Sequence, residues 1–219
     1  TCAVIIEPIQ GESGILPATQ EYLQAARRLC DKHGALLILD EVQTGMGHTG
    51  KLFAYEHYGV TPDILSSAKA LGGGFPIGAI LTTDKIAPTF GPGTHGSTFG
   101  GNPMACAVGS RAFDIINAPK TLAHVEQQGQ KLQTALREIG EKTGVFKEVR
   151  GMGLLLGCVL ADKYEGKASE ITAAALKHGL MVLVAGANVV RFAPSLLLND
   201  EDMAEGLKRF EAALAKWLA

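Results

Sequence analysis

The sequence predicts an α/β protein with a mostly parallel sheet, followed by a smaller α+β unit. Apolar runs at residues 3–6 and 35–39 flank an amphipathic segment at 19–33. A strand–helix–strand order of this length is typical of neighbouring parallel strands. From about residue 118 the pattern changes to longer amphipathic segments separated by short apolar runs. We therefore expect two domains, at residues 1–118 and 119–219.

Helical and strand periodicities define the elements of the first domain. The helix at 19–33 carries its apolar residues at helical spacing and is expected to end before Gly34, a residue that favours the left-handed conformation of helix ends. Two further strands are expected at residues 64–67 and 76–82, and a second helix at 104–117. Glycine-rich loops are expected between these elements, at residues 10–17, 44–50 and 91–103.

The second domain alternates amphipathic helices with short strands. Helices are expected at residues 122–139, 170–178 and 200–218, and strands within 145–160, at 181–184 and at 189–192. Gly151 and Gly153 interrupt the apolar run between 145 and 160, which therefore contains one or two strands. Asn199 or Asp200 is expected to cap the last helix, because both side chains accept hydrogen bonds from N–H groups of a first turn.

Composition excludes several classes of protein. The 219 residues carry a net charge of −2, which gives no electrostatic basis for binding nucleic acid or an anionic membrane surface. No apolar run approaches the roughly 20 residues of a membrane-spanning helix. The four cysteines are scattered and the histidines lack ligand spacing, so we expect neither a disulfide framework nor a metal site, but a cytoplasmic protein.

The chain begins at Thr1 within an apolar strand pattern and has no initiator methionine. A domain seldom opens inside a buried strand. We therefore expect the chain to be the carboxyl-terminal part of a longer protein.

Asp40 and Lys69 are the first candidates for chemistry. Asp40 and Glu41 directly follow a buried apolar strand, and ligands of parallel sheets bind beyond the carboxyl ends of the strands. Consecutive strand residues face opposite sides, so we assign Asp40 to the site and Glu41 to a structural role. Lys69 lies between small residues and a glycine turn, where an amine can form an imine with an aldehyde cofactor. The alternative for Asp40 and Glu41 is that both acids only solvate the end of the strand. The alternative for Lys69 is an ordinary exposed lysine before a flexible turn.

Three other segments suit anionic ligands. Ser97 and Thr98 lie in a loop of hydroxyls and glycines just before a helix, a combination that suits a phosphate, although a capped loop is the alternative. Arg191 is a cation in an apolar strand and needs an acidic partner, either a substrate carboxylate or an acid of the protein. Glu12 is ordinary loop chemistry unless Arg191 approaches it. The glycines at 72–74 match no nucleotide-binding motif, and a turn with positive φ explains them better.

Read in order, these segments resemble the class III aminotransferases, which have the aspartate-aminotransferase-like (type I) fold of pyridoxal-phosphate enzymes. The matching stretches cover nearly the whole chain and are EPIQGESG, LLILDEVQTGMGHTG, TPDILSSAKALGGGFPIGA, GTHGSTFGGNP and VVRFAP. The separation of Asp40 and Lys69 fits the family pattern. By this resemblance the chain holds part of the large cofactor-binding domain and the smaller carboxyl-terminal domain.

The resemblance implies a role in binding pyridoxal 5'-phosphate for five residues. Lys69 corresponds to the lysine that forms the imine, and Asp40 to the acid that pairs with the pyridine nitrogen. Gln43 would contact the phenolic oxygen. Thr98 matches a residue that reaches the phosphate held by the neighbouring subunit of a homodimer, with Ser97 beside it.

The resemblance also assigns the substrate contacts. Arg191 corresponds to the arginine that binds the α-carboxylate, and Glu12 to the glutamate that masks this arginine for one substrate and releases it for the other. His48 stands where the family usually has arginine, so an anion contact at that position is not expected to carry over.

The implied reaction is transamination between N-acetylornithine or succinylornithine and 2-oxoglutarate, as in arginine metabolism, since the sequence is most similar to the acylornithine-specific members. The alternatives are ornithine, 4-aminobutyrate or an aminomutase substrate on the same fold, and an inactive fragment. The family's serine–glycine–threonine phosphate loop and ring-stacking aromatic residue lie upstream of Thr1. The 219-residue piece alone is therefore expected to bind the cofactor poorly and to be inactive.

Overall fold

The computed structural model describes residues 1–219, which form two compact units. The first unit contains residues 1–8, 18–47 and 51–119. The second unit contains the remaining residues, at 9–17, 48–50 and 120–219. The chain therefore leaves the first unit twice, at two short segments that fold with the carboxyl-terminal half.

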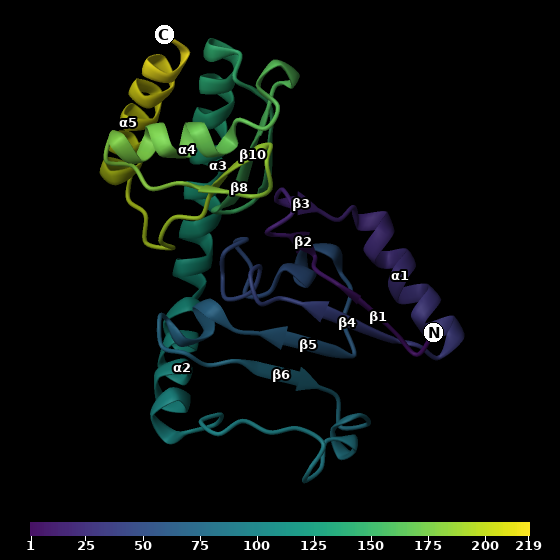
Figure 1. Ribbon diagram of the computed structural model, residues 1–219. Helices are drawn as coiled ribbons and strands as arrows, with labels where there is room; N and C mark the ends of the chain where they lie inside the picture. The colour runs from purple at the N-terminus through teal and green to yellow at the C-terminus, as the bar shows by residue number, and fades with distance from the viewer. The chain divides into compact units, whose positions relative to one another are not determined.

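The sheet of the first unit has four strands in the order β1-β4-β5-β6 (Figure 1). They span Ala3–Ile6, Leu36–Asp40, Ile64–Ser67 and Ala79–Thr82. The first three are parallel and β6 is antiparallel to β5, so the predicted mostly parallel sheet is confirmed. The last strand begins at Ala79 rather than Pro76, a residue that has no N–H to donate to a ladder.

Helix α1 (Gln20–His33) covers this sheet beside β1 and β4 (Figure 1). The Thr19 hydroxyl accepts the backbone N–H of Tyr22 at the start of the helix, and Gly34 ends it in the left-handed conformation with φ of 66°. Leu23 lies on the buried face of α1 and is fully buried. Four shorter or later elements complete the unit: η1 (Ala54–Tyr58), η2 (Lys69–Gly72), η3 (Ala87–Thr89) and α2 (Pro103–Ile116).

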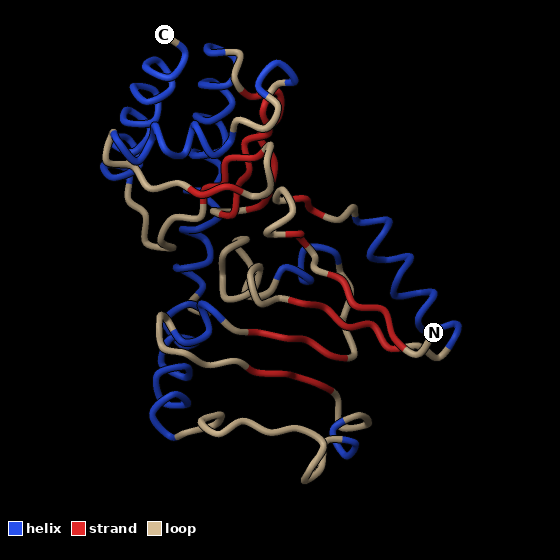
Figure 2. Tube along the Cα trace, viewed as in Figure 1, coloured by secondary structure: helices blue, strands red, loops and turns tan.

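The second unit places helices on one face of an antiparallel sheet (Figure 2). Its strands follow the order β7-β8-β10-β9 and span Phe146–Met152, Leu155–Leu160, Val189–Phe192 and Leu183–Val184. Its helices are α3 (Pro119–Thr143), η4 (Asp162–Tyr164), α4 (Ala168–Lys177) and α5 (Asp200–Leu218). Asn199 caps α5 by accepting the backbone N–H of Asp202 at 2.8 Å, as expected. None of the helices has the length and apolar character needed to cross a membrane.

A short hairpin covers part of this sheet and was not predicted. Its strands β2 (Ile9–Gln10) and β3 (Leu16–Pro17) are antiparallel. Ile9 and Ile15 are fully buried and pack with Leu155 and neighbouring residues of the sheet. The loop that carries Glu12 is therefore fixed at both ends, because the hairpin on either side of it is anchored in a hydrophobic cluster.

Candidate active site

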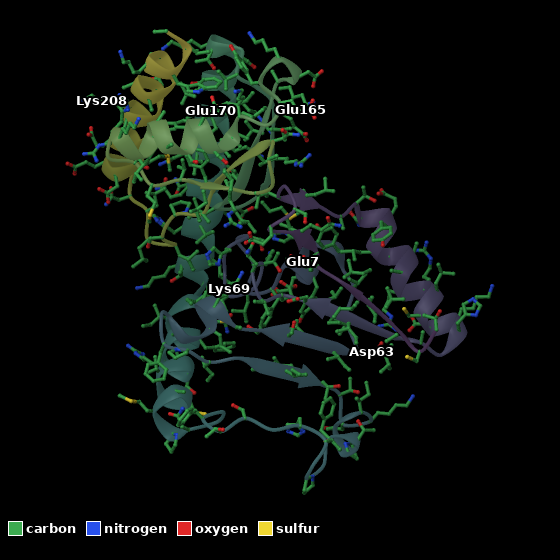
Figure 3. All side chains as sticks on the ribbon, in the orientation of Figure 1. Glu7, Asp63, Lys69, Glu165, Glu170 and Lys208 are labelled. Atoms are coloured by element: carbon green, nitrogen blue, oxygen red, sulfur yellow. The ribbon has the colours of Figure 1, made fainter.

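The carboxyl ends of the parallel strands form one edge of the first unit's sheet. Figure 3 shows Glu7, which follows β1, and Lys69, which follows β5, at this edge, whereas Asp63 lies at the opposite edge. Asp40 is the last residue of β4 and is paired in register with Ser66 of β5. The two residues predicted to carry the chemistry, Asp40 and Lys69, thus lie at the carboxyl ends of neighbouring strands, at the same edge of the sheet.

The two oxygens of Asp40 have different surroundings. Oδ1 accepts hydrogen bonds from the Ser66 hydroxyl at 2.9 Å and from the Val42 backbone N–H at 3.0 Å. Oδ2 accepts none, and no cation of the chain pairs with the carboxylate. The arrangement offers one open acceptor with a negative charge, which suits a protonated ring nitrogen.

Lys69 has an exposed side chain and a strained backbone. Its φ is 47°, in the left-handed region that a lysine seldom adopts. The side-chain amine makes no ion pair within the chain, so an aldehyde can reach it without first displacing a partner. The turn beyond it requires glycine, as predicted, because Gly73 and Gly74 have φ of 55° and 110°.

Glu41 differs from its neighbour Asp40, because its carboxylate is buried and both of its oxygens accept hydrogen bonds. The side chain accepts hydrogen bonds from the Thr44 hydroxyl and from the backbone N–H groups of Ala54 and Tyr55, at 2.9 and 2.8 Å for the two backbone donors. Burial raises the pKa of Glu41, and the three donors offset that effect only in part. Glu41 thus connects the end of β4 to η1, in agreement with the structural role expected for it.

The remaining cofactor candidates of the first unit lie on loops. Gln43 is partly buried in the turn after β4. Ser97 and Thr98 are exposed in the segment before α2. The Ser97 hydroxyl accepts the Gly100 backbone N–H at 2.9 Å, whereas the Thr98 hydroxyl has no partner in the chain. Thr98 therefore offers a free hydroxyl just before the start of a helix, where a phosphate is favoured.

The second unit pairs Arg191 with Glu12. An Arg191 nitrogen lies 2.6 Å from a Glu12 oxygen, although 179 residues separate them in sequence. The arginine side chain is 11% exposed and the glutamate side chain 70% exposed. The cation is therefore held in β10, whereas its partner is exposed on the loop between the two strands of the hairpin.

Arg150 of β7 fixes the base of that loop and was missed by the sequence reasoning. Its guanidinium donates to the carbonyl oxygens of Gly14, at 2.8 and 3.0 Å, and of Ile15, at 3.1 Å. Ile15 itself has a positive φ of 49°. An arginine next to a glycine-rich turn carries no local signal of a partner so distant in sequence.

The first unit's residues fit pyridoxal 5'-phosphate by their chemistry. The open oxygen of Asp40 can accept a hydrogen bond from a pyridinium, and the unpaired amine of Lys69 can react with an aldehyde. The free Thr98 hydroxyl suits a phosphate. In the second unit, Arg191 is suited to a carboxylate that displaces Glu12.

Comparison with protein families and known relatives gives one consistent result. The family model described as "Aminotransferase class-III" matches residues 1–214. A relative named acetylornithine aminotransferase, from Neisseria meningitidis serogroup B, is 80% identical over 219 residues, which are 100% of this chain and 55% of the relative. A Pseudomonas aeruginosa protein named succinylornithine transaminase/acetylornithine aminotransferase is 58% identical over 216 residues, 99% of this chain and 53% of the relative.

A solved structure agrees in fold. The crystal structure of N-acetylornithine aminotransferase from Stenotrophomonas maltophilia matches with a TM-score of 0.91 and 48% identity, over 99% of this chain and 57% of that one. The predicted aspartate-aminotransferase-like fold is therefore confirmed. This chain spans about half the length of the relatives that it matches.

Proposed function

This chain belongs to the class-III aminotransferase family, and from that premise we propose that it acts as part of an enzyme that moves an amino group from an acylated ornithine to 2-oxoglutarate. The donor would be N-acetylornithine or succinylornithine, because relatives of both names match closely. The observation that carries the proposal is that two reactive groups lie at neighbouring strand ends. One is an open carboxylate oxygen on Asp40, and the other is an amine on Lys69 that makes no ion pair.

The family's cofactor is pyridoxal 5'-phosphate, which when bound supplies an aldehyde that accepts amino groups and a ring that withdraws electrons from the reacting carbon. We propose that Lys69 and Asp40 hold it at the aldehyde and ring nitrogen, with Gln43 at the phenolic oxygen. Ser97 and Thr98 would bind its phosphate.

The residues of this chain then have distinct tasks in the proposed reaction. Lys69 would hold the cofactor covalently, and its amine, once released, would move a proton to or from the reacting substrate carbon. Asp40 would stabilise a positive charge on the ring nitrogen by ion pairing. Arg191 binds the α-carboxylate of glutamate or 2-oxoglutarate after Glu12 moves aside, and Glu12 cancels the arginine's charge when the acylated ornithine reacts.

A direct test uses the full-length protein incubated with pyridoxal 5'-phosphate and reduced with borohydride. Peptide mapping is expected to find a single pyridoxyl adduct, on Lys69. A substrate panel of N-acetylornithine, succinylornithine, ornithine and 4-aminobutyrate then ranks the donors by kcat/KM. An adduct on another lysine, or none, would remove the proposal, whereas a preference for ornithine or 4-aminobutyrate would change only the substrate.

Glu12→Gln tests the proposed masking of Arg191. The amide keeps the size of the side chain but cannot neutralise the guanidinium. Because the glutamate is largely exposed, we expect a modest effect, about a threefold lower KM for 2-oxoglutarate, with a correspondingly weaker use of the acylated ornithine. Steady-state kinetics of the two half-reactions measures both. Equal changes in the two half-reactions would contradict the masking role.

We also propose that the enzyme is a homodimer in which Thr98 acts on the cofactor of the neighbouring subunit. The unpartnered, exposed hydroxyl supports this, as does the 81% exposure of the adjacent Phe99. Mixing a Lys69→Ala subunit with a Thr98→Ala subunit should then restore activity, to about a quarter of the wild-type value for random dimers. If Thr98 acts within its own subunit, every site of the mixed dimer keeps one defect and no activity returns.

A cytoplasmic location and a role in arginine metabolism complete the proposal. The four cysteines are all free, two of them exposed, which supports a reducing compartment.

A further inference from the structure

Two carboxylates at strand ends of this sheet, Asp63 and Asp40, differ in whether a cation neutralises them. Asp63, just before β5, accepts hydrogen bonds from Arg27 at 2.9 Å and from the Leu37 backbone N–H at 2.7 Å. An arginine of the chain thus neutralises it. Asp40 is also held by two donors, but neither donor is a cation. These donors fix the position of the carboxylate, and no cation of the chain neutralises its charge.

The geometry of the two donors makes this positioning specific. Both Ser66 and Val42 bond to the same oxygen, Oδ1, and leave Oδ2 open. The Val42 N–H is local and follows from the turn after β4. The Ser66 hydroxyl comes from the next strand, 26 residues away, at the position directly paired with Asp40. Together they hold the carboxylate in one orientation, with one oxygen bonded and the other open, since turning its plane would break both bonds.

We infer that Ser66 is a positioning residue for cofactor chemistry, and that its hydroxyl fixes the Asp40 carboxylate so that Oδ2 is presented to the N–H of a protonated aromatic ring nitrogen. The inference rests on the proposed use of pyridoxal 5'-phosphate. It adds that the charge on the ring depends on an uncharged hydroxyl in the neighbouring strand. No step requires Ser66 to touch the cofactor.

The hydroxyl is not needed to hold the strands together. The ladder between β4 and β5 pairs Ile38 with Ile64 and Leu39 with Leu65 through backbone groups alone. Ser67, the next residue, is a serine in the same strand whose hydroxyl makes no hydrogen bond, since its Oγ is buried and has no partner. The two adjacent serines therefore form a natural matched pair, one on the Asp40 side of the strand and one on the other.

The test compares Ser66→Ala, Ser66→Thr and Ser67→Ala in the full-length protein, without substrate. Each variant is titrated with pyridoxal 5'-phosphate labelled with ¹⁵N in the ring, and the ¹⁵N chemical shift reports protonation of the nitrogen. For Ser66→Ala we expect a shift toward the neutral-ring value and about a fivefold higher Kd, because a hydrogen bond to a charged group is lost. Ser66→Thr keeps the hydroxyl and should restore both, and Ser67→Ala should match the wild type.

The outcomes separate this inference from the proposed function. Wild-type protein that binds no cofactor, or binds it with a neutral ring nitrogen, would end the proposed role of Asp40 itself. A protonated ring in the wild type that remains equally protonated in Ser66→Ala would leave Asp40 in place and overturn the role of Ser66. A loss of stability in Ser66→Ala with an unchanged ¹⁵N shift would likewise show that the bond only supports the sheet.

Discussion

Replacing Lys69 by alanine in the full-length protein is expected to lower the rate of both half-reactions by on the order of 10⁴-fold or more. Two functions are lost at once, the covalent hold on the cofactor and the group that moves the proton. The amine is exposed and unpaired in the structure, so no ion pair of the fold depends on it. Single-turnover kinetics with each substrate measures the loss.

Two further variants separate charge from nucleophilicity. Lys69→Arg keeps the positive charge but not a nucleophilic amine, and we expect it to be as inactive as the alanine variant. Lys85→Ala removes another exposed lysine of the same unit that has no ion pair, and its rates should equal those of the wild type. Substantial turnover by Lys69→Arg would show that the residue acts only as a cation and would rule out the proposed covalent role.

Local patterns in the sequence were sufficient to predict most of the fold. The helix at Gln20–His33 and the parallel strands β1, β4 and β5 follow from apolar periodicity and from the turn residues between them. Periodicity does not determine strand direction, and the antiparallel pairing of β6 could not be predicted from it. The β2–β3 hairpin has only two residues in each strand, too few to show an alternation.

The candidate site likewise has residues that the sequence could predict and residues that it could not. Asp40 and Lys69 could be proposed as candidates because Asp40 ends β4 and Lys69 lies just beyond β5, at the edge where parallel sheets bind ligands. Ser66 could not be recognised as the partner of Asp40, because their contact depends on the register between two strands. Arg150 was missed for a similar reason, since its bonds to the Glu12 loop cross 136 residues of sequence.

The second large effect is expected at Glu41, and it concerns stability rather than chemistry. The carboxylate is 1% exposed and receives three hydrogen bonds, one on Oε1 from Tyr55 and two on Oε2 from Thr44 and Ala54. Removing a buried acceptor leaves its donors without partners. For Glu41→Ala we therefore expect about 3 kcal/mol of local destabilisation between the end of β4 and η1.

Glu41→Gln should be nearly as harmful, although it is almost identical in size. An amide has one oxygen, so its NH₂ group must face at least one of the two backbone N–H donors. Hydrogen exchange in the full-length protein can measure this locally, at the amides of Ala54 and Tyr55. About 3 kcal/mol corresponds to exchange on the order of 100-fold faster.

Glu56→Gln provides the matched control. This exposed side chain accepts only one bond, from the Phe53 backbone N–H at 2.9 Å, and a glutamine oxygen can replace it. Exchange at Ala54 and Tyr55 should therefore stay within a few-fold of the wild type, as for other surface changes. Equal acceleration in the two variants would mean that the segment is sensitive to any loss of charge, and that Glu41 has no special structural role.

The pH dependence of stability supplies an independent check. Burial raises the pKa of Glu41 in the folded protein above the ordinary value of 4.5, so the folded state holds this proton more tightly than the unfolded state. The resulting stabilisation is present in full below pH 4.5 and is lost as the pH rises through the folded pKa. Glu41→Gln has no proton to lose, so its stability should lack this decline. A difference between wild type and Glu41→Gln that grows as the pH rises toward 4.5 and then stays constant would require a lowered pKa, and with it a carboxylate that the three donors stabilise more than burial penalises.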